Sequence, residues 1–181
     1  MKILPCTVWL TGLSAAGKTT LAHALAAGLV AKSMACDVLD GDVLRQTLCR
    51  DLGFSRQDRR ENVRRVATRC RKLNDAGIIA IAALVSPYGA DRDMARHLVG
   101  IDRFLEVFVS TPLSVCEERD PKGLYRKARA GEIPNLTGIG DVYEVPLRPD
   151  LAIDTSQQPS GTSVIAILHT LESRKMLSIS Q

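Results

Sequence analysis

The stretch Gly12-Leu13-Ser14-Ala15-Ala16-Gly17-Lys18-Thr19 decides the fold of this chain. It has the spacing G-x-x-x-x-G-K-[ST] at every fixed position, which is the spacing of a phosphate-binding loop. An apolar run over residues 3–10 leads into it, and a helical pattern with leucine at positions 21, 25 and 29 leads out of it. This order of strand, loop and helix is the setting in which the spacing binds a nucleotide. We therefore expect a nucleotide-binding α/β fold.

The residue types of the loop explain how it would hold a nucleotide. Gly12 and Gly17 let the backbone turn tightly and approach an anion closely. The loop's N–H groups then point at the phosphates from a helix N-terminus, whose dipole favours negative charge. Lys18 adds a positive charge for the β- and γ-phosphates, and the hydroxyl of Thr19 can ligate Mg²⁺. We expect ATP and Mg²⁺ as ligands, with further loop contacts from Ser14, Ala15, Ala16 and Thr20.

Composition excludes several other classes of protein. With 181 residues, of which 45% are hydrophobic, the chain is long enough for one folded domain over residues 1–181. No apolar run approaches the length of a membrane-spanning helix, and we expect a cytoplasmic protein without a signal peptide. The five cysteines are scattered and include no C-x-x-C pair, which favours reduced thiols. A net charge of +4 suits a pocket for small anions, and we expect no nucleic-acid or membrane partner.

Strand and helix patterns alternate along the chain, which indicates a parallel sheet with helices on both faces. The expected strands are 3–11, 36–39, 78–85, 104–109 and 151–154. The expected helices run from the loop to about 32, and then over 43–50, 55–76, 91–98, from 112 onward, and 163–173. The predicted fold class is α/β: a three-layer P-loop kinase fold with a mostly parallel five-stranded sheet and a mobile lid.

The lid is expected over about 120–143, a segment that is basic, rich in glycine and proline, and poor in large apolar residues, so that no buried apolar stripe is expected in it. Five cations lie on it or beside it: Arg119, Lys122, Arg126, Lys127 and Arg129. A mobile basic segment suits a lid that closes over ATP and excludes water. The alternative, an ordinary basic surface loop, would not explain the length of the insertion.

Polar residues follow two of the predicted strands, at the sheet edge where such folds bind ligands. Asp42 is the carboxylate expected nearest a reacting hydroxyl, where it could accept a proton or hold Mg²⁺ through water. The alternative is that Asp40 and Asp42 only cap the next helix. The strand over 78–85 is followed by Ser86, where many nucleotide hydrolases have an aspartate, and this difference favours a small-molecule kinase.

Arginines near these strand ends are candidate anion-binding residues. Arg45 lies three residues after Asp42, and Arg59 and Asn62 share a helix face at the spacing i, i+3. Most of the other arginines of that helix are expected on a solvated face: Arg64, Arg65, Arg69 and Arg71.

Together these segments resemble the adenylyl-sulfate kinase (APS kinase) family, from Val8 to about Leu151. The resemblance is carried by GLSAAGKTT at 12–20, LDGD at 39–42, DRRENVRR at 58–65, SPY at 86–88, DR at 91–92, RDPKGLYRKAR at 119–129 and YEVP at 143–146. A phosphate loop alone indicates a superfamily, whereas this combination is highly specific. The resemblance implies that ATP phosphorylates the ribose 3′-hydroxyl of adenosine 5′-phosphosulfate, giving 3′-phosphoadenosine 5′-phosphosulfate and ADP. It also implies a homodimer.

The resemblance further implies roles for individual residues. Asp42 matches an aspartate near the 3′-hydroxyl and Mg²⁺, and Phe54 matches an aromatic that stacks on the substrate adenine. Ser86 matches a position considered for a phosphoenzyme, although direct in-line transfer is simpler chemistry. The nucleotide is expected to contact Arg119 and Lys122. The expected catalytic residues are Lys18, Asp42 and Ser86, and the expected metal ligands are Thr19 and Asp42. The expected substrate-binding residues are Asp42, Arg45, Phe54, Arg59, Asn62, Val85, Ser86, Lys122 and Leu136.

One departure from the family concerns the substrate pocket. The family's lid usually has Lys-Gly-Phe where this chain has Pro134-Asn135-Leu136. That phenylalanine would close the second side of an aromatic clamp on the substrate adenine. Leu136 in its place is therefore expected to affect substrate affinity more than catalysis.

Two alternatives belong to different functional classes. A non-catalytic nucleotide-sensing domain could lose Lys18 and the loop glycines without penalty, and all of them are present here. Another small-molecule kinase on the same scaffold, for gluconate, shikimate or a nucleoside monophosphate, is disfavoured by the segments DRRENVRR and KGLY.

Overall fold

The computed structural model describes residues 4–174 and residue 176. Within these residues five parallel strands form one sheet in the order β2-β3-β1-β4-β5. Parallel neighbours require crossover connections, which here are helices that pack on the sheet. The strands are β1 (Thr7–Thr11), β2 (Cys36–Asp40), β3 (Ile79–Ala83), β4 (Phe104–Val109) and β5 (Leu151–Ile153).

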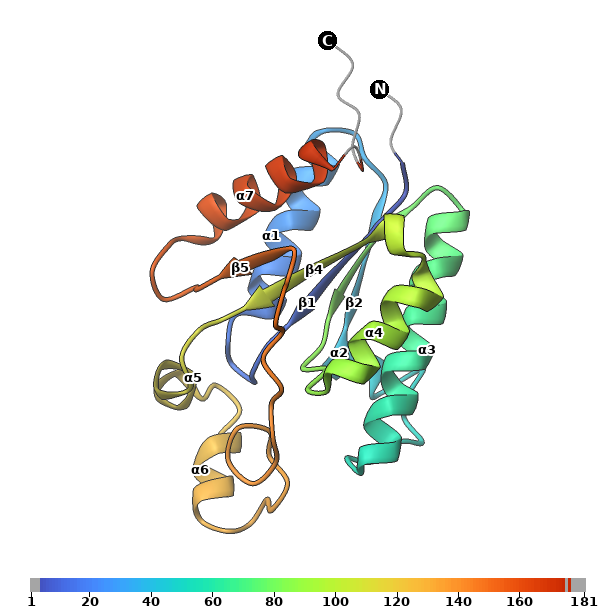
Figure 1. Cartoon of the computed structure of the whole chain (residues 1–181). Helices are drawn as coiled ribbons and strands as arrows, with labels where there is room; N and C mark the ends of the chain where they lie inside the picture. Colours follow the sequence, from blue (N-terminus) through green and yellow to red (C-terminus); the bar gives the residue numbers. More distant parts are fainter. Residues whose placement is uncertain (1–3, 175, 177–181) are drawn as a thin grey trace.

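Long helices cover both faces of the sheet (Figure 1). One face is covered by α1 (Lys18–Ala31) and α7 (Ser160–Ser173), and the other by α3 (Arg56–Asp75) and α4 (Gly89–Val99). Successive side chains of a strand point to opposite faces, so β1 contributes to both cores. Val8 and Leu10 lie in the core beside α1 and α7, whereas Trp9 lies beside α3 and α4. The central strands are therefore buried on both sides, as their uninterrupted apolar sequence predicts.

Three short helices lie beyond the carboxyl ends of the strands (Figure 1). The helix α2 (Gly41–Leu44) follows β2, and α5 (Leu113–Arg119) and α6 (Leu124–Arg129) follow β4. At the opposite end of the sheet, a 3₁₀ turn (Ile101–Arg103) leads into β4. Ser55 is the N-cap of α3, since its hydroxyl accepts a hydrogen bond from Asp58 N at 3.1 Å. This capping and the start of α5 after Pro112 agree with the sequence.

The predicted fold class is confirmed, with differences at element boundaries. The first strand begins at Thr7, and residue 3, where it was expected to begin, lies outside the described residues. The helix expected over 43–50 is the single turn α2, followed by turns up to residue 51. The closing helix begins at Ser160 rather than at 163. All five cysteines are free thiols. Among the described residues, no helix combines the length and apolar character needed to cross a bilayer.

The segment 120–143 is more ordered than its composition predicted. It contains α6, where Tyr125 is only 1% exposed and Ala128, one turn later, is also buried. Leu136 and Ile139 pack against the same core. The expectation of a segment without a buried apolar stripe is therefore wrong, because a few well-spaced residues suffice to dock it. Its mobility stays a prediction.

Candidate active site

A cavity of about 1150 Å³ opens at the carboxyl ends of the strands, where open α/β sheets bind ligands. The phosphate loop, the ends of β2 and β3, the first half of α3 and the segment 119–137 form its walls. Of the site residues expected from the sequence, only Gly12 and Ala16 do not line the cavity. Those that do are Ser14, Ala15, Gly17, Lys18, Thr19, Thr20, Asp42, Arg45, Phe54, Arg59, Asn62, Val85, Ser86, Arg119, Lys122 and Leu136.

Gly12 and Ala16, together with Gly17, fix the shape of the phosphate loop through close packing. A Cβ at Gly12 would lie 2.5 Å from the carbonyl oxygen of Val109, so only glycine fits against β4. Gly17 has φ +98 at the N-cap of α1, and a Cβ there would lie 2.9 Å from Thr155 Oγ1. Ala16 is fully buried. The loop is therefore held by close packing against β4 and Thr155 at the N-terminus of α1, a position that favours anion binding.

Lys18 lies under the loop with its ammonium turned inward. The side chain donates to Gly12 O at 2.9 Å and to Leu13 O at 2.6 Å, and the residue is only 9% exposed. Burial lowers the pKa of Lys18 to about 8, although Cys116 and Asp42 act in the opposite direction. A cation that is buried without a full counter-charge favours a polyanionic ligand, because the ligand would supply the missing charge.

The two aspartates of the 39–42 segment have different partners. Asp40 is nearly buried and accepts two hydrogen bonds, from Asp42 N at 2.9 Å and from Thr19 Oγ1 at 2.6 Å. The capping alternative is thus correct for Asp40, which also orients the hydroxyl of Thr19. Asp42 projects into the cavity with its side chain 61% exposed, and it forms an ion pair with Lys122 of the lid.

Phe54 lies beside two arginines at the other end of the cavity. Its side chain is 58% exposed. The guanidinium of Arg45 lies 4.1 Å from the ring centroid and that of Arg59 lies 5.7 Å from it. Burial and the neighbouring Arg59 lower the pKa of Arg45. An exposed aromatic ring beside two close cations is suited to a planar ligand that carries negative charge.

Buried polar groups line the cavity wall beside Phe54. Arg59 donates to Phe54 O and to Asn135 O, both at 3.0 Å. Asn62, on the same face of α3, is nearly buried, and among the described residues its Oδ1 has no hydrogen-bond partner. Leu136 also lines this cavity and is partly buried against the core. The helical spacing of Arg59 and Asn62 thus places both side chains as the sequence predicts.

Ser86 is part of the cavity wall, but its hydroxyl is already engaged. The residue is 4% exposed and its Oγ accepts a hydrogen bond from Trp9 Nε1 at 3.1 Å. Its φ of +39 lies in the left-handed region that non-glycine residues avoid. A strained, engaged serine suits a positioning role better than attack on phosphorus.

The segment after β4 contacts the phosphate loop at two points that the sequence did not predict. Arg119 donates to Thr155 Oγ1 at 2.8 Å and, more weakly, to Ala15 O at 3.4 Å. Tyr125 donates to Ser14 O at 2.9 Å, and burial raises its pKa above the usual range, so the phenol stays protonated. The motif RDPKGLYRKAR contained both contacts, but only the fold shows which side chains turn inward.

These geometries give the site a definite chemical character. One end offers backbone N–H groups and a buried lysine for phosphates, the other an aromatic ring with cations, and Asp42 lines the same cavity. Among the described residues, no group of three or more His, Cys, Asp or Glu side chains could hold a metal ion. A metal held here would need other oxygen ligands, such as water or phosphate, as Mg²⁺ commonly has.

The chain is similar to proteins of known function over most of its length. The model of the adenylylsulphate kinase family matches residues 4–154. An adenylyl-sulfate kinase from Pseudomonas aeruginosa is 51% identical over 171 residues, which are 94% of this chain and 87% of that protein. The Mycobacterium tuberculosis APS kinase in complex with AMPPNP and APS has a TM-score of 0.90 at 42% identity, covering 94% of this chain and 99% of that one. A hexameric APS kinase from Thiobacillus denitrificans has a TM-score of 0.73 at 33% identity, covering 97% of this chain and 30% of that one.

Proposed function

This chain belongs to the adenylylsulphate kinase family, and from that premise we propose how its residues carry out the reaction. The enzyme uses ATP to phosphorylate the 3′-hydroxyl of adenosine 5′-phosphosulfate, giving 3′-phosphoadenosine 5′-phosphosulfate and ADP. The observation that carries the residue roles is that one cavity contains both subsites. This cavity joins the phosphate loop to the Phe54 subsite, with Asp42 in its wall.

ATP binds at the phosphate loop in this proposal. The loop's N–H groups and the ammonium of Lys18 hold the phosphates, so Lys18 exchanges its two carbonyl partners for phosphate oxygens. Arg119, at the hinge between α5 and the lid, lies beside the nucleotide base. Lys122 reaches the cavity from the lid. Lys122 pairs there with the carboxylate of Asp42. In this proposal the phosphoryl group being transferred is a second anionic partner for Lys122.

The residues present fit Mg²⁺ as the accompanying ion. Thr19 donates its single hydroxyl proton to Asp40, which leaves the lone pairs of Thr19 Oγ1 available to a cation. Thr19 would hold the ion directly and Asp42 through water, with the nucleotide completing the ligands. The ion would neutralise charge on the phosphates during transfer.

Asp42 is the proposed general base. It accepts the proton of the substrate 3′-hydroxyl as that oxygen forms its bond to the γ-phosphorus. The bond between the γ-phosphorus and the bridging oxygen breaks, and that oxygen leaves on ADP. Because Ser86 is engaged by Trp9, we propose direct transfer and assign Val85 and Ser86 to the wall of the substrate pocket.

The phosphosulfate substrate occupies the other end of the cavity. Its adenine lies on Phe54, and Leu136 supplies apolar contact from the lid. Arg45 and Arg59 bind the anionic phosphosulfate group, and Asn62 supplies the Oδ1 acceptor that has no partner among the described residues. A buried acceptor without a partner is costly, so a ligand donor there would contribute affinity.

We also propose one domain over 1–181, a homodimer and a cytoplasmic location. The exposed apolar side chains Val142, Val145 and Leu147 near the end of the lid support an interface between copies. Sedimentation of the purified protein would measure the assembly directly.

The decisive experiment is ADP release with adenosine 5′-phosphosulfate, gluconate, shikimate and nucleoside monophosphates as acceptors. We expect turnover with the phosphosulfate alone. Arg59→Gln should raise the KM for this substrate and leave the KM for ATP nearly unchanged. Arg64→Gln is the matched control, because Arg64 lies on the exposed face of the same helix and, among the described residues, its guanidinium pairs only with Glu61. Nucleotide binding without turnover would instead indicate a sensing domain.

A further inference from the structure

The lid rejoins the sheet at Tyr143 and Glu144, which are fixed to the body by several contacts. The ring of Tyr143 stacks on Phe108 of β4 at 5.9 Å between centroids. Glu144 N donates to Pro87 O at 2.8 Å, and its carboxylate accepts from Gly89 N at 2.6 Å. This lid exit therefore lies directly against the segment that follows β3 and forms the wall of the substrate pocket.

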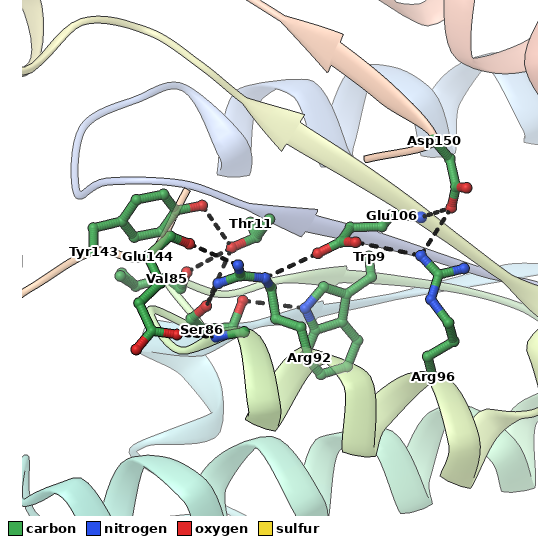
Figure 2. A network of polar contacts seen from close by, with 11 residues as sticks. Trp9, Thr11, Val85, Ser86, Arg92, Arg96, Glu106, Tyr143, Glu144 and Asp150 are labelled. Atoms are coloured by element: carbon green, nitrogen blue, oxygen red, sulfur yellow. Dashed lines mark hydrogen bonds and ion pairs between the residues drawn. The ribbon is translucent and has the colours of Figure 1, made fainter. Parts of the chain in front are cut away.

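Two side chains connect the lid exit to that wall (Figure 2). Thr11 Oγ1 lies 2.8 Å from Val85 O and 2.9 Å from the hydroxyl of Tyr143. Thr11 has one proton, and the carbonyl can only accept, so Tyr143 donates to Thr11 and Thr11 donates to Val85. Burial raises the pKa of Tyr143 to about 12, which keeps its phenol protonated as this chain requires.

Arg92 makes the second and stronger connection. Its Nη1 donates to Ser86 O at 2.8 Å and its Nη2 to Glu144 O at 2.6 Å. Its Nε donates to Glu106 Oε1 at 2.9 Å, and its side chain is only 4% exposed. One planar guanidinium thus joins the pocket wall, the lid exit and β4 (Figure 2). The wall residue that it holds is Ser86, whose φ of +39 needs such support.

We propose that Arg92, with Thr11 beside it, is a positioning residue for the phosphosulfate substrate. It fixes Val85 and Ser86 in the pocket wall relative to the point where the lid rejoins the sheet. The inference rests on the proposed function, because the wall at Ser86 matters only if the substrate lies against it. Arg92 itself does not line the cavity, so its effect passes through Ser86.

The shape of the arginine side chain makes this role specific. The three acceptors lie on three separate segments, and each binds a different nitrogen of the rigid, planar guanidinium of Arg92. A lysine would keep the charge opposite Glu106, but its ammonium is a compact point charge that cannot match this fork. Arg92→Lys therefore removes the connection while preserving the buried charge.

Arg96 provides a matched control. It lies one turn later on α4 and binds the same carboxylate, with Nη2 at 3.3 Å from Glu106 Oε2 and 3.2 Å from Asp150 Oδ2. Neither Ser86 nor the lid exit is among its partners. Arg96→Lys thus disturbs the same charge network without touching the connection (Figure 2).

The experiment measures steady-state kinetics, unfolding midpoints in urea and hydrogen exchange in the full-length protein. We expect Arg92→Lys to raise the KM for the phosphosulfate substrate about tenfold, to leave the KM for ATP within twofold, and to speed exchange of the Glu144 amide, which donates to Pro87 O. Arg96→Lys should keep both KM values within twofold of the wild-type values, even if its urea unfolding midpoint falls as far as that of Arg92→Lys. Thr11→Val, which removes the parallel connection, should raise the same KM about threefold.

Each outcome decides the inference. If folded Arg92→Lys and Arg96→Lys have the same KM for the phosphosulfate substrate, Arg92 is a structural residue only and the proposal is overturned. Should Arg92→Lys fail to fold, an unchanged KM in folded Thr11→Val overturns it equally. If the wild-type protein does not turn over the phosphosulfate at all, the proposed function itself fails. That result is distinguishable from an effect of Arg92→Lys or Thr11→Val, because it is measured in the unchanged protein.

Discussion

Replacing Lys18 with methionine should abolish turnover and yet stabilise the protein. Methionine keeps the length and apolar volume of the side chain and removes the charge. The charge is needed for catalysis, since stabilisation of the transferring phosphoryl group is worth two or more powers of ten in kcat. In the folded protein, however, this charge lies beneath the loop, and Lys18 is only 9% exposed.

The size of the gain follows from the pKa. Burial lowers the pKa of Lys18 from 10.5 to about 8. Each pKa unit corresponds to about 1.4 kcal/mol, so the charge costs the folded state roughly 3 kcal/mol at neutral pH. Methionine also loses the hydrogen bonds to Gly12 O and Leu13 O, worth about 1 kcal/mol each. We expect a net stabilisation of about 1 kcal/mol at pH 7.

The sign of the pH dependence provides the sharper test. Below pH 8 Lys18 is charged in both states, and the folded state bears the full cost. Between pH 8 and 10.5 the folded side chain is neutral while the unfolded one still binds a proton, so this group makes the wild type more stable as pH rises. Urea unfolding at pH 7 and pH 10 should therefore show the advantage of Lys18→Met shrinking at the higher pH.

Lys122→Met is the control for this measurement. Lys122 also enters the cavity, but its side chain is 50% exposed. Its ion pair with Asp42 is solvated, and we expect a change in unfolding free energy within about 1 kcal/mol. The reasoning is refuted if Lys18→Met is less stable than wild type at pH 7, or if its advantage is the same at both pH values.

Four further predictions concern the reaction and the lid. The kcat/KM for ATP should fall about tenfold per pH unit above pH 8, because Lys18 of the free enzyme loses its proton. The kcat should stay nearly constant over the same range, because bound phosphates favour the charged form of Lys18. Initial rates measured against pH test both expectations. Asp42→Asn should lower kcat by about two powers of ten in ADP-release assays with an unchanged urea midpoint, because its side chain is exposed. Tyr125→Phe removes the donor to the phosphate loop and should cost about 1 kcal/mol, with faster hydrogen exchange in α6. Leu136→Phe should lower the KM for the phosphosulfate about fivefold by adding a second aromatic face opposite Phe54, and an unchanged KM would contradict that placement.

Local patterns in the sequence were sufficient for the fold and for most of the pocket. The spacing of the phosphate loop requires a strand before it and a helix after it, and both are present as β1 and α1. Arg59 and Asn62 reach the cavity together because three residues is nearly one helical turn. These inferences depend only on residues that are close in sequence, where periodicity and backbone geometry act directly.

The division of roles between Asp40 and Asp42 could not be predicted in the same way. Both carboxylates follow one strand, and both suit a cap or a catalytic site equally well. The outcome depends on Thr19, which the fold brings within 2.6 Å of Asp40 because α1 begins beside the end of β2. A contact across 21 residues is decided by packing, which no local pattern contains.

The connection through Arg92 was also outside local reasoning, although the sequence contains one signal for it. Arg92 in the pattern of α4 resembles an ordinary surface cation, and its partner Glu144 lies 52 residues away. The neighbouring strand, however, is the apolar stretch 104–109 with a single charged residue, Glu106. A carboxylate inside a buried strand is too costly to stand alone, so it requires a buried cation from the helix that covers it. Glu106 therefore predicts a buried cationic partner. The structure shows that this partner is Arg92 of α4 and that its two remaining nitrogens bind Ser86 O and Glu144 O.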